Sequence, residues 1–240
     1  EFTMRMKPSY SNFNIMNSQE QMDVYKNMEQ NGSLSFVDSY RASQSGVYGK
    51  MYHLINQYSA TGGVFGLANT PEARGAYLKQ AEFRNTDWFD LLFSNSISQN
   101  HAVSMATGTD KASYYTSISV MNDPGWTKRS KVQRYTANIN STYNIFKNLT
   151  LNLIGNASFR KQQAPGTLGS QADPVSGEVK RDFDINPYSF ALNTSRTLDP
   201  NEYYVRNYAP FNIFHELDNN YMDLKVTDMR FQGEMKWKPI

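Results

Sequence analysis

Hydrophobic and polar residues alternate almost without interruption from Arg134 to Arg160. A period of two sends successive side chains to opposite faces of a β-sheet. The odd positions carry mostly apolar residues, and the even positions of the two strands carry asparagine, threonine, serine and arginine, with Ile154 as the exception. The break at residues 146–148 predicts two long strands joined by a short turn, a hairpin with one apolar and one amide-rich face.

The same alternation predicts further strands on both sides of this hairpin. The predicted strands lie near residues 2–13, 100–107, 113–121, 132–145, 149–160 and 223–237. Pro8 interrupts the first strand and indicates a bend or an edge. Two long connections, residues 14–99 and 161–222, contrast with the short turns at 108–111 and 146–148.

Two-faced strands joined by short turns at one end and long loops at the other are typical of outer-membrane barrels. Tyr114, Tyr143 and Trp237 would lie on the apolar face near the short turns, where an aromatic girdle is expected. The apolar runs fall far short of the roughly 20 residues of a membrane helix. We therefore predict an all-β fold, an antiparallel transmembrane β-barrel segment of about six strands of a larger barrel.

The long connections, expected to be extracellular, carry signals for short helices. Ser18-Gln19-Glu20-Gln21 has the pattern of a capping box, and Thr70-Pro71-Glu72 places proline at the first helical position. A further helical turn is expected within Asp87–Phe93. The segment from Ala164 to Asn220 is rich in proline, glycine, asparagine and aspartate and is predicted to be loop.

Composition narrows the function only in part. The net charge of +2, from 24 basic and 22 acidic residues, gives no electrostatic reason to expect nucleic acid or an anionic membrane surface as a partner. The chain has no cysteine, which excludes disulfides and thiolate metal sites. Aromatic residues make up 14% of the chain, which suits a barrel with girdles and equally a soluble secreted β-sandwich that binds carbohydrate or acts as an adhesin.

Candidate chemistry is sparse. His53, His101 and His215 are far apart and lack the spacing of metal ligands. Asp87 and Asp90 could form a glycosidase-like carboxylate pair, but helix capping explains them better. We therefore expect no catalytic residues, no metal and no cofactor.

Substrate contacts are expected from the polar face of the hairpin and from aromatic residues of the last long loop. The amides would face a water-filled lumen, and the tyrosines could stack on sugars, contact a partner protein or pack within the loop. The candidate substrate-binding residues are Arg134, Asn138, Asn140, Tyr203, Tyr204 and Tyr208.

A series of short motifs carries a family resemblance. In order they are Asn85-Thr86-Asp87-Trp88-Phe89-Asp90-Leu91-Leu92-Phe93, Gln99-Asn100-His101, Gly108 with Tyr114-Tyr115-Thr116-Ser117, Gly125, and Arg134-Tyr135 with Asn140. This order resembles the SusC/RagA-type TonB-dependent outer-membrane transporters. The resemblance spans residues 1–160 and 230–240, and Asn138 departs from it because arginine is frequent at that position.

The resemblance implies a large barrel with an internal plug, embedded in outer-membrane lipid of a Gram-negative cell. It implies a SusD-like surface lipoprotein as partner and import of oligosaccharides or peptides driven by the TonB complex. The plug, the TonB box and most of the barrel have no counterpart in this sequence. We therefore expect the first part of a barrel from a longer protein, which would contact the TonB complex through its missing N-terminal part.

Overall fold

A computed structural model describes residues 1–33, 46–165, 171–172, 179–180, 186–206 and 209–239. The chain divides into two compact units. The sheet unit comprises Glu1–Lys7, Ser94–Gly166 and Tyr221–Ile240, and the loop unit comprises Pro8–Phe93 and Thr167–Asn220. Each long connection predicted from the sequence therefore contributes to the loop unit.

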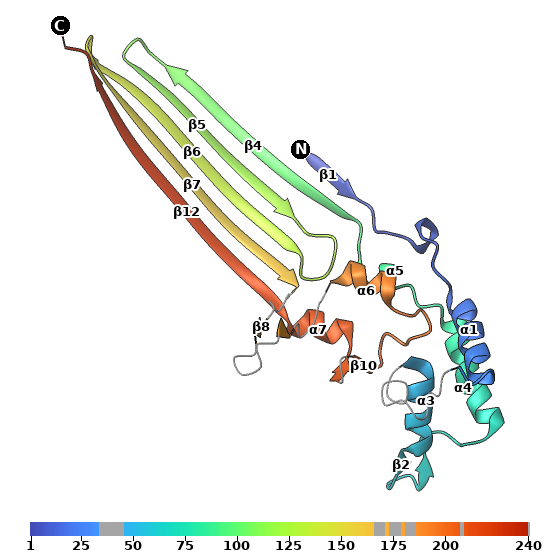
Figure 1. The fold of residues 1–240 in the computed structure, drawn as a ribbon. Coiled ribbons are helices and arrows are strands. Elements are labelled where there is room, and N and C mark those ends of the chain that lie inside the picture. Colours follow the sequence, from blue (N-terminus) through green and yellow to red (C-terminus); the bar gives the residue numbers. More distant parts are fainter. Residues whose placement is uncertain (34–45, 166–170, 173–178, 181–185, 207–208, 240) are drawn as a thin grey trace. The chain divides into compact units, whose positions relative to one another are not determined.

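The sheet unit is a single antiparallel sheet of six strands (Figure 1). In spatial order the strands are β1 (Phe2–Arg5), β4 (Ser96–Gly108), β5 (Ala112–Asp123), β6 (Lys131–Phe146), β7 (Leu149–Pro165) and β12 (Tyr221–Trp237). From β4 to β7, strands that are neighbours in the sheet are also consecutive along the chain, as in a meander. Strands β1 and β12 form the two open edges of the sheet. The described residues of this unit contain no second sheet that packs on the first.

The first strand is shorter than the predicted range 2–13. It ends at Arg5, the backbone N–H of Lys7 donates to the Asn95 side chain, and Pro8 has no N–H to continue a ladder. The chain then forms a 3-10 helix over Tyr10–Asn12. Near the opposite edge of the sheet, β7 continues to Pro165 and extends into the segment predicted to be loop, because β12 pairs with it along its whole length.

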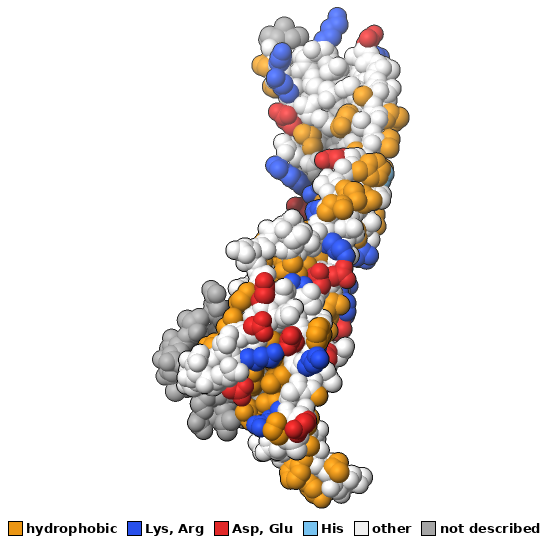
Figure 2. Space-filling model, turned by 90° about the vertical axis from the view of Figure 1, so that its right-hand side faces the viewer, with side chains coloured by type: hydrophobic (Ala, Val, Ile, Leu, Met, Phe, Trp, Pro, Cys, Tyr) orange, Lys and Arg blue, Asp and Glu red, His pale blue; other side chains and the backbone are white. Residues whose placement is uncertain are grey.

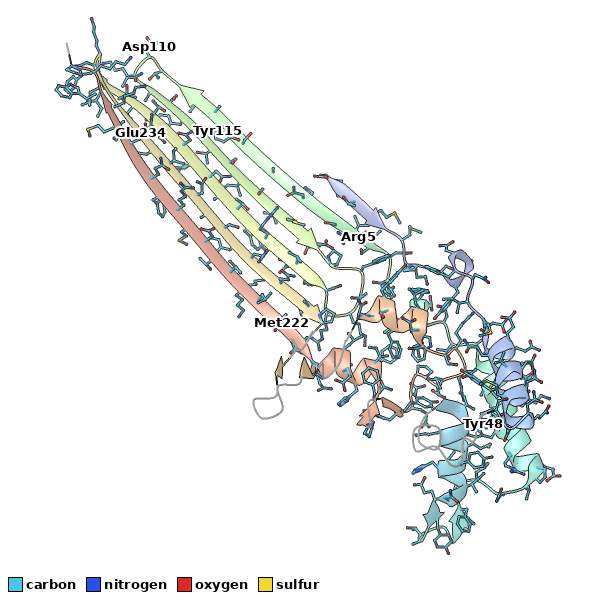
Figure 3. All side chains as sticks on the ribbon, in the orientation of Figure 1. Arg5, Tyr48, Asp110, Tyr115, Met222 and Glu234 are labelled. Atoms are coloured by element: carbon cyan, nitrogen blue, oxygen red, sulfur yellow. The ribbon has the colours of Figure 1, made fainter. Side chains whose placement is uncertain are left out.

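Strand register divides the sheet into two chemically different faces. We call the side that carries Tyr135, Ile139 and their register partners the apolar face, and the opposite side the polar face. No described residue of the sheet unit covers the apolar side chains: Val103 is 76% exposed, Ile139 51% and Phe231 81%. Figures 2 and 3 show side chains of both kinds projecting from this sheet.

The centre of the apolar face is one row across three strands. Ile139 pairs with Gly155, and Gly155 pairs with Phe231. A Cβ at Gly155 would lie 3.4 Å from both Ile139 Cγ2 and the Phe231 ring. The glycine therefore leaves room for the two larger side chains that flank it.

The loop unit is built from short helices and two-stranded hairpins. Its helices are α1 (Ser18–Gln30), α3 (Gly46–Asn56), α4 (Pro71–Arg84), α5 (Trp88–Leu92), α6 (Pro187–Asn193) and α7 (Ile213–Asn219). Its hairpins pair β2 (Tyr58–Ser59) with β3 (Val64–Phe65), β8 (Gln171–Ala172) with β9 (Val179–Lys180), and β10 (Tyr204–Arg206) with β11 (Ala209–Phe211). No helix among the described residues is long and apolar enough to cross a membrane.

Local capping explains where several of these helices begin. The capping box of α1 is formed by Asn17 and Glu20, one residue before the predicted pattern. The Ser18 hydroxyl, expected to be the cap, instead donates to the backbone oxygen of Glu82. Thr70 caps α4 with Pro71 following, and Asp87 caps α5. The helices α3, α6 and α7 were not predicted, and two of them lie in the segment predicted to be loop.

Two apolar clusters hold the loop unit together. The first packs α1, α3 and α4 around the buried side chains Met22, Val47, Tyr48, Met51, Ile55 and Ala81. The second surrounds Phe89, which is fully buried and stacks on Phe13 with ring centroids 5.3 Å apart. Tyr10 and Tyr188 complete this aromatic contact.

Candidate functional site

The polar face of the sheet brings together the three hairpin residues selected from the sequence. Arg134, Asn138 and Asn140 are separated by even numbers of residues on β6 and therefore point to the same side. Strands β5, β7 and β12 add partners to each of these positions. The result is a largely polar surface along the length of the sheet, interrupted by Met121, Ile154 and Val226.

Asn138 lies in an amide-rich row. It pairs with Ser117 on β5 and with Asn156 on β7, and Asn156 pairs with Arg230 on β12. The Asn138 side chain donates a hydrogen bond from Nδ2 to Ser117 Oγ at 3.1 Å. Its carbonyl oxygen and the neighbouring amide offer both acceptors and donors to a polar cargo.

Asn140 lies beside an aromatic side chain. Its register partner on β5 is Tyr115, whose side chain is 46% exposed, and its partner on β7 is Ile154. Asn140 and Tyr115 border a groove of about 470 Å³ that also includes Thr142. An aromatic ring next to an amide is suited to a ligand with both an apolar surface and hydrogen-bonding groups.

Arg134 faces a second arginine. It pairs directly with Arg160 on β7, and both side chains are exposed. Within the part of the chain that the structure describes, neither guanidinium forms an ion pair. Arg160 was not selected from the sequence, although its even position in the same hairpin placed it on this face.

The tyrosines selected from the last long loop belong to the loop unit. Tyr203 is 45% exposed, and its ring centroid lies 5.9 Å from that of His215. Tyr204 is half-buried: its hydroxyl accepts a hydrogen bond from the backbone N–H of Asp199, and Lys50 Nζ lies 5.8 Å from its ring centroid. Burial raises the pKa of Tyr204. Tyr208 lies outside the described residues.

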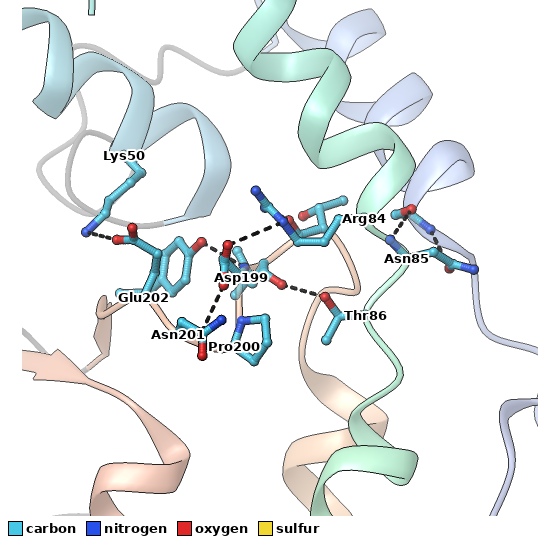
Figure 4. A network of polar contacts seen from close by, with 12 residues as sticks. Lys50, Arg84, Asn85, Thr86, Asp199, Pro200, Asn201 and Glu202 are labelled. Carbon is cyan, nitrogen blue, oxygen red and sulfur yellow. Dashed lines mark hydrogen bonds and ion pairs between the residues drawn. The ribbon is translucent and has the colours of Figure 1, made fainter. Parts of the chain in front are cut away.

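Charged groups around Tyr204 form a small network (Figure 4). Lys50 Nζ is 2.9 Å from Glu202 Oε2 and donates to the backbone oxygen of Tyr203. On the other side, Arg84 Nε lies 3.8 Å from Asp199 Oδ2. The network fixes the loop that carries Tyr204, so this tyrosine is a structural element of the loop unit.

The loop unit also contains a cavity that the sequence did not indicate. Its volume is about 390 Å³, and it is lined by aromatic side chains from three separate segments, Trp88, Phe190 and Phe211, together with Tyr204. Asn193 and Glu202 provide polar groups at its wall. Only the tertiary fold brings these residues together, and a cavity of this size and composition could hold a small ligand group.

The Asn85–Phe93 motif, the first in the series that carries the family resemblance, has a structural role in the loop unit. Thr86 and Arg196 exchange hydrogen bonds, with the Thr86 N–H donating to Arg196 O at 2.9 Å and Arg196 Nε donating to Thr86 O at 3.1 Å. The Trp88 indole donates to Ser195 O at 3.1 Å. The motif therefore fixes the segment after α6 to the segment before α5.

The acidic and histidine side chains weighed as metal-binding or catalytic groups have the following positions. Among the described residues, no group of three or more histidine, aspartate or glutamate side chains gathers in a way that could hold a metal ion. The Asp87 carboxylate accepts the backbone N–H of Asp90 at 2.9 Å, so the suspected carboxylate pair is a helix cap.

Sequence comparison finds similar proteins among TonB-dependent receptors. The chain is 32% identical over 149 residues to TonB-dependent receptor P26 of Formosa agariphila, covering 53% of this chain and 15% of that protein. It is 36% identical over 63 residues to TonB-dependent receptor SusC of Bacteroides thetaiotaomicron, covering 26% of this chain and 6% of that protein. No family model matches the chain.

Structure comparison finds the same fold in a longer protein. All of this chain aligns with 25% of a chain of the RagAB peptide importer in its closed-closed state, with a TM-score of 0.61 and 14% identity. The RagAB peptide transporter gives a TM-score of 0.59 at 13% identity. The chain thus spans a quarter or less of the proteins it matches. Their names describe receptors and importers.

Proposed function

We propose that this chain, a segment of a SusC/RagA-type TonB-dependent transporter, forms part of the barrel wall of an outer-membrane nutrient importer. The receptor relatives and the importer structures support this assignment. The observation that carries it is the two-faced sheet, whose apolar face is left uncovered by the described residues of its unit. In a barrel wall the apolar face contacts lipid, the polar face lines a water-filled lumen, and the open edges pair with further strands.

The dimensions of the apolar face fit a membrane. Tyr135 and Tyr143 mark its two ends on β6, about 26 Å apart along the strand at ~3.3 Å per residue. A tilt of roughly 40° reduces this to about 20 Å of membrane height, close to the expected apolar band. Tyr143 packs edge-on against Tyr114 with ring centroids 5.5 Å apart, and Tyr135 pairs with Phe159. Aromatic residues thus mark both ends of the band, as in barrel girdles.

The connections orient the wall. The β4–β5 and β6–β7 turns lie at one end of the sheet, where Figure 3 labels Asp110 and Glu234. The connections that contribute to the loop unit leave from the opposite end, where Met222 is labelled. Because outer-membrane barrels have short periplasmic turns and longer outer loops, we place the loop unit on the extracellular side.

The polar face supplies the proposed cargo contacts. Arg134, Asn138 and Asn140 of β6 would face the lumen, with Arg160 and Tyr115 as additional contacts found in the structure. The opposed arginines favour a cargo that carries a carboxylate or another anionic group. In the loop unit, the exposed Tyr203 and the aromatic cavity beside Tyr204 would provide further contacts.

The partners follow from the same assignment. We propose a SusD-like surface lipoprotein on the extracellular side and energy from the TonB complex, reached through other parts of the transporter. Cargo would be oligosaccharides or peptides, and the peptide importer among the structural neighbours supports the second class. Purification of the intact transporter from its native membrane tests the partner, which should copurify as a lipoprotein in equal amounts.

A spin label tests the lipid-facing assignment. In the full-length transporter reconstituted in lipid, a label at Ile139 should be accessible to oxygen and shielded from a water-soluble nickel reagent. The matched label at Asn138, one residue earlier and on the opposite face, should show the reverse. Water exposure at Ile139, or burial of that label inside a globular core, would refute the barrel assignment and favour the secreted β-sandwich.

A further inference from the structure

The apolar face changes character abruptly at its outer end. We call the stretch of this face between Tyr143 and Tyr135 the apolar band, and its outermost row contains Tyr135 and Phe159. In the next row on the same face, Lys161 of β7 pairs with both Gln133 of β6 and Lys225 of β12. One row further, Gln163 pairs with Lys131 and Asp223. Three lysines therefore lie directly beyond the aromatic end of the band.

These lysines line a common groove. Lys131, Lys161 and Lys225 are exposed and border a groove of about 300 Å³ on the sheet surface. Asp223, the acidic residue among the groove's lining residues, accepts a hydrogen bond from Gln163 at 3.0 Å. In the described part of the chain, none of the three ammonium groups forms an ion pair.

The pairing of Lys161 with Lys225 is unfavourable by itself. Like charges placed directly opposite each other on one sheet face repel. Lysine stems can lie along the apolar surface while the ammonium groups reach the polar interface. An anion held between them would relieve the repulsion and occupy the groove.

The opposite end of the same face lacks this feature. Its last row pairs Phe146 with Leu149 and Leu149 with Trp237. The nearest strand lysine, Lys236, pairs with Thr150 and lies on the polar face. Among the described strand residues, the lysines on the apolar face therefore lie at the outer end, whereas the lysines of the opposite end lie in turns or on the polar face. This distribution indicates a ligand of the outer leaflet.

We propose that Lys131, Lys161 and Lys225 form a binding site for the phosphate groups of lipids in the outer leaflet. The apolar band would contact the acyl chains, and the groove beyond Tyr135 and Phe159 would hold the phosphate of the same molecule. Lysine binds phosphate as a point charge, and basic groups at a membrane margin recognise anionic head groups. The inference rests on the proposed placement of the apolar face in the membrane.

Native mass spectrometry of the full-length transporter in a neutral detergent tests the site. The probes are phosphorylated lipid A, its dephosphorylated form and inorganic phosphate. The test variant combines Lys131→Gln, Lys161→Gln and Lys225→Gln. The matched control combines Lys111→Gln, Lys147→Gln and Lys238→Gln, which removes the same charge at the short-turn end.

The wild type and the control should retain phosphorylated lipid A, and the test variant should retain about tenfold less. Inorganic phosphate should not displace the lipid, because the acyl chains contribute to binding. Equal retention by the test variant, equal retention of the dephosphorylated lipid, or an equal loss in the control would overturn the proposal. If the spin label at Ile139 still reports lipid, such a result removes the phosphate site and leaves the barrel assignment intact.

Discussion

Arg134 of β6 and Arg160 of β7 are direct register partners on the polar face of the sheet. Like charges in this arrangement repel, so the pair does not stabilise the sheet. The nearest acidic residues on the neighbouring strands are each one row away: Asp228 of β12, which pairs with Ser158, and Asp123 of β5, which is ion-paired with Arg5. A pair of planar guanidinium groups exposed on a lumen-facing surface is suited to bind a carboxylate.

Replacing this pair should reduce the uptake of anionic cargo selectively. Arg134→Gln with Arg160→Gln should weaken binding of a carboxylate-bearing oligosaccharide or peptide by about tenfold or more, since each charged hydrogen bond contributes roughly 1.5–3 kcal/mol. Binding of the neutral analogue should change far less. The measurement is cargo affinity of the purified transporter by calorimetry. Equal losses for the two cargoes would show that the pair has no role in recognising charge.

A charge placed in the middle of the apolar face should be costly. Ile139 lies midway between Tyr135 and Tyr143, so Ile139→Lys should destabilise the full-length protein in lipid vesicles by about 2–4 kcal/mol. Asn138→Lys on the opposite face is the control and should cost no more than about 1.5 kcal/mol, for the lost hydrogen bond to Ser117. Urea unfolding measures both. Similar costs would mean that the two faces do not differ in environment.

Gly125 is required by the connection between β5 and β6. Its φ is +82°, and a Cβ added there would lie 1.5 Å from the backbone oxygen of Ser130. Gly125→Ala should therefore destabilise the sheet by at least ~2 kcal/mol, from left-handed strain together with the displaced backbone. Its N–H also donates to Asp123, the ion-pair partner of Arg5, so the adjoining β1 contact should loosen.

The same substitution in α4 provides the control for Gly125. A Cβ at Gly75 would meet nothing within 4 Å, and the residue lies inside the helix. Gly75→Ala should be neutral or stabilise by about 0.5–1 kcal/mol because alanine loses less entropy in a helix. The shift of the urea unfolding midpoint is measured for both variants. A Gly125→Ala variant that is as stable as the wild type would contradict the described conformation of the connection between β5 and β6.

Tyr10 should make the loop unit sensitive to alkaline pH. Burial raises the pKa of Tyr10 to about 12, although the Arg196 guanidinium beside its ring opposes the shift. The unfolded chain has a tyrosine pKa of about 10. The stability from neutral Tyr10 is therefore complete below pH ~10 and is lost as the pH rises toward ~12.

Tyr10→Phe should remove this part of the alkaline transition. It should also cost about 1–2 kcal/mol near neutral pH, because the Tyr10 hydroxyl donates to the backbone oxygen of Ala191. The difference in tyrosinate absorbance between the wild type and Tyr10→Phe should titrate near pH 12. Tyr58 is 57% exposed, and Tyr58→Phe controls for the loss of one tyrosine. A difference spectrum that titrates near pH 10 would show that Tyr10 is not buried.

The candidate site could be predicted only in part. Strand alternation placed Arg134, Asn138 and Asn140 on one face because side-chain direction in a strand depends on sequence position alone. The opposition of Arg134 and Arg160 needed the register, which the turn between β6 and β7 sets. Tyr204 was a candidate substrate contact with packing inside the loop as the alternative, and the structure shows its hydroxyl bonded to Asp199 and its ring beside Lys50 within the loop unit.

The sequence by itself determined the two-faced strands, the short turns between them and the helix starts at Thr70 and Asp87, because these depend on neighbouring residues. Only the tertiary structure decided that β7 and β12 pair along their full length across a long insertion, and that Trp88, Phe190 and Phe211 line one cavity. It likewise set Lys161 against Lys225 beyond the apolar band. Contacts between distant segments depend on register and packing, which local patterns do not specify.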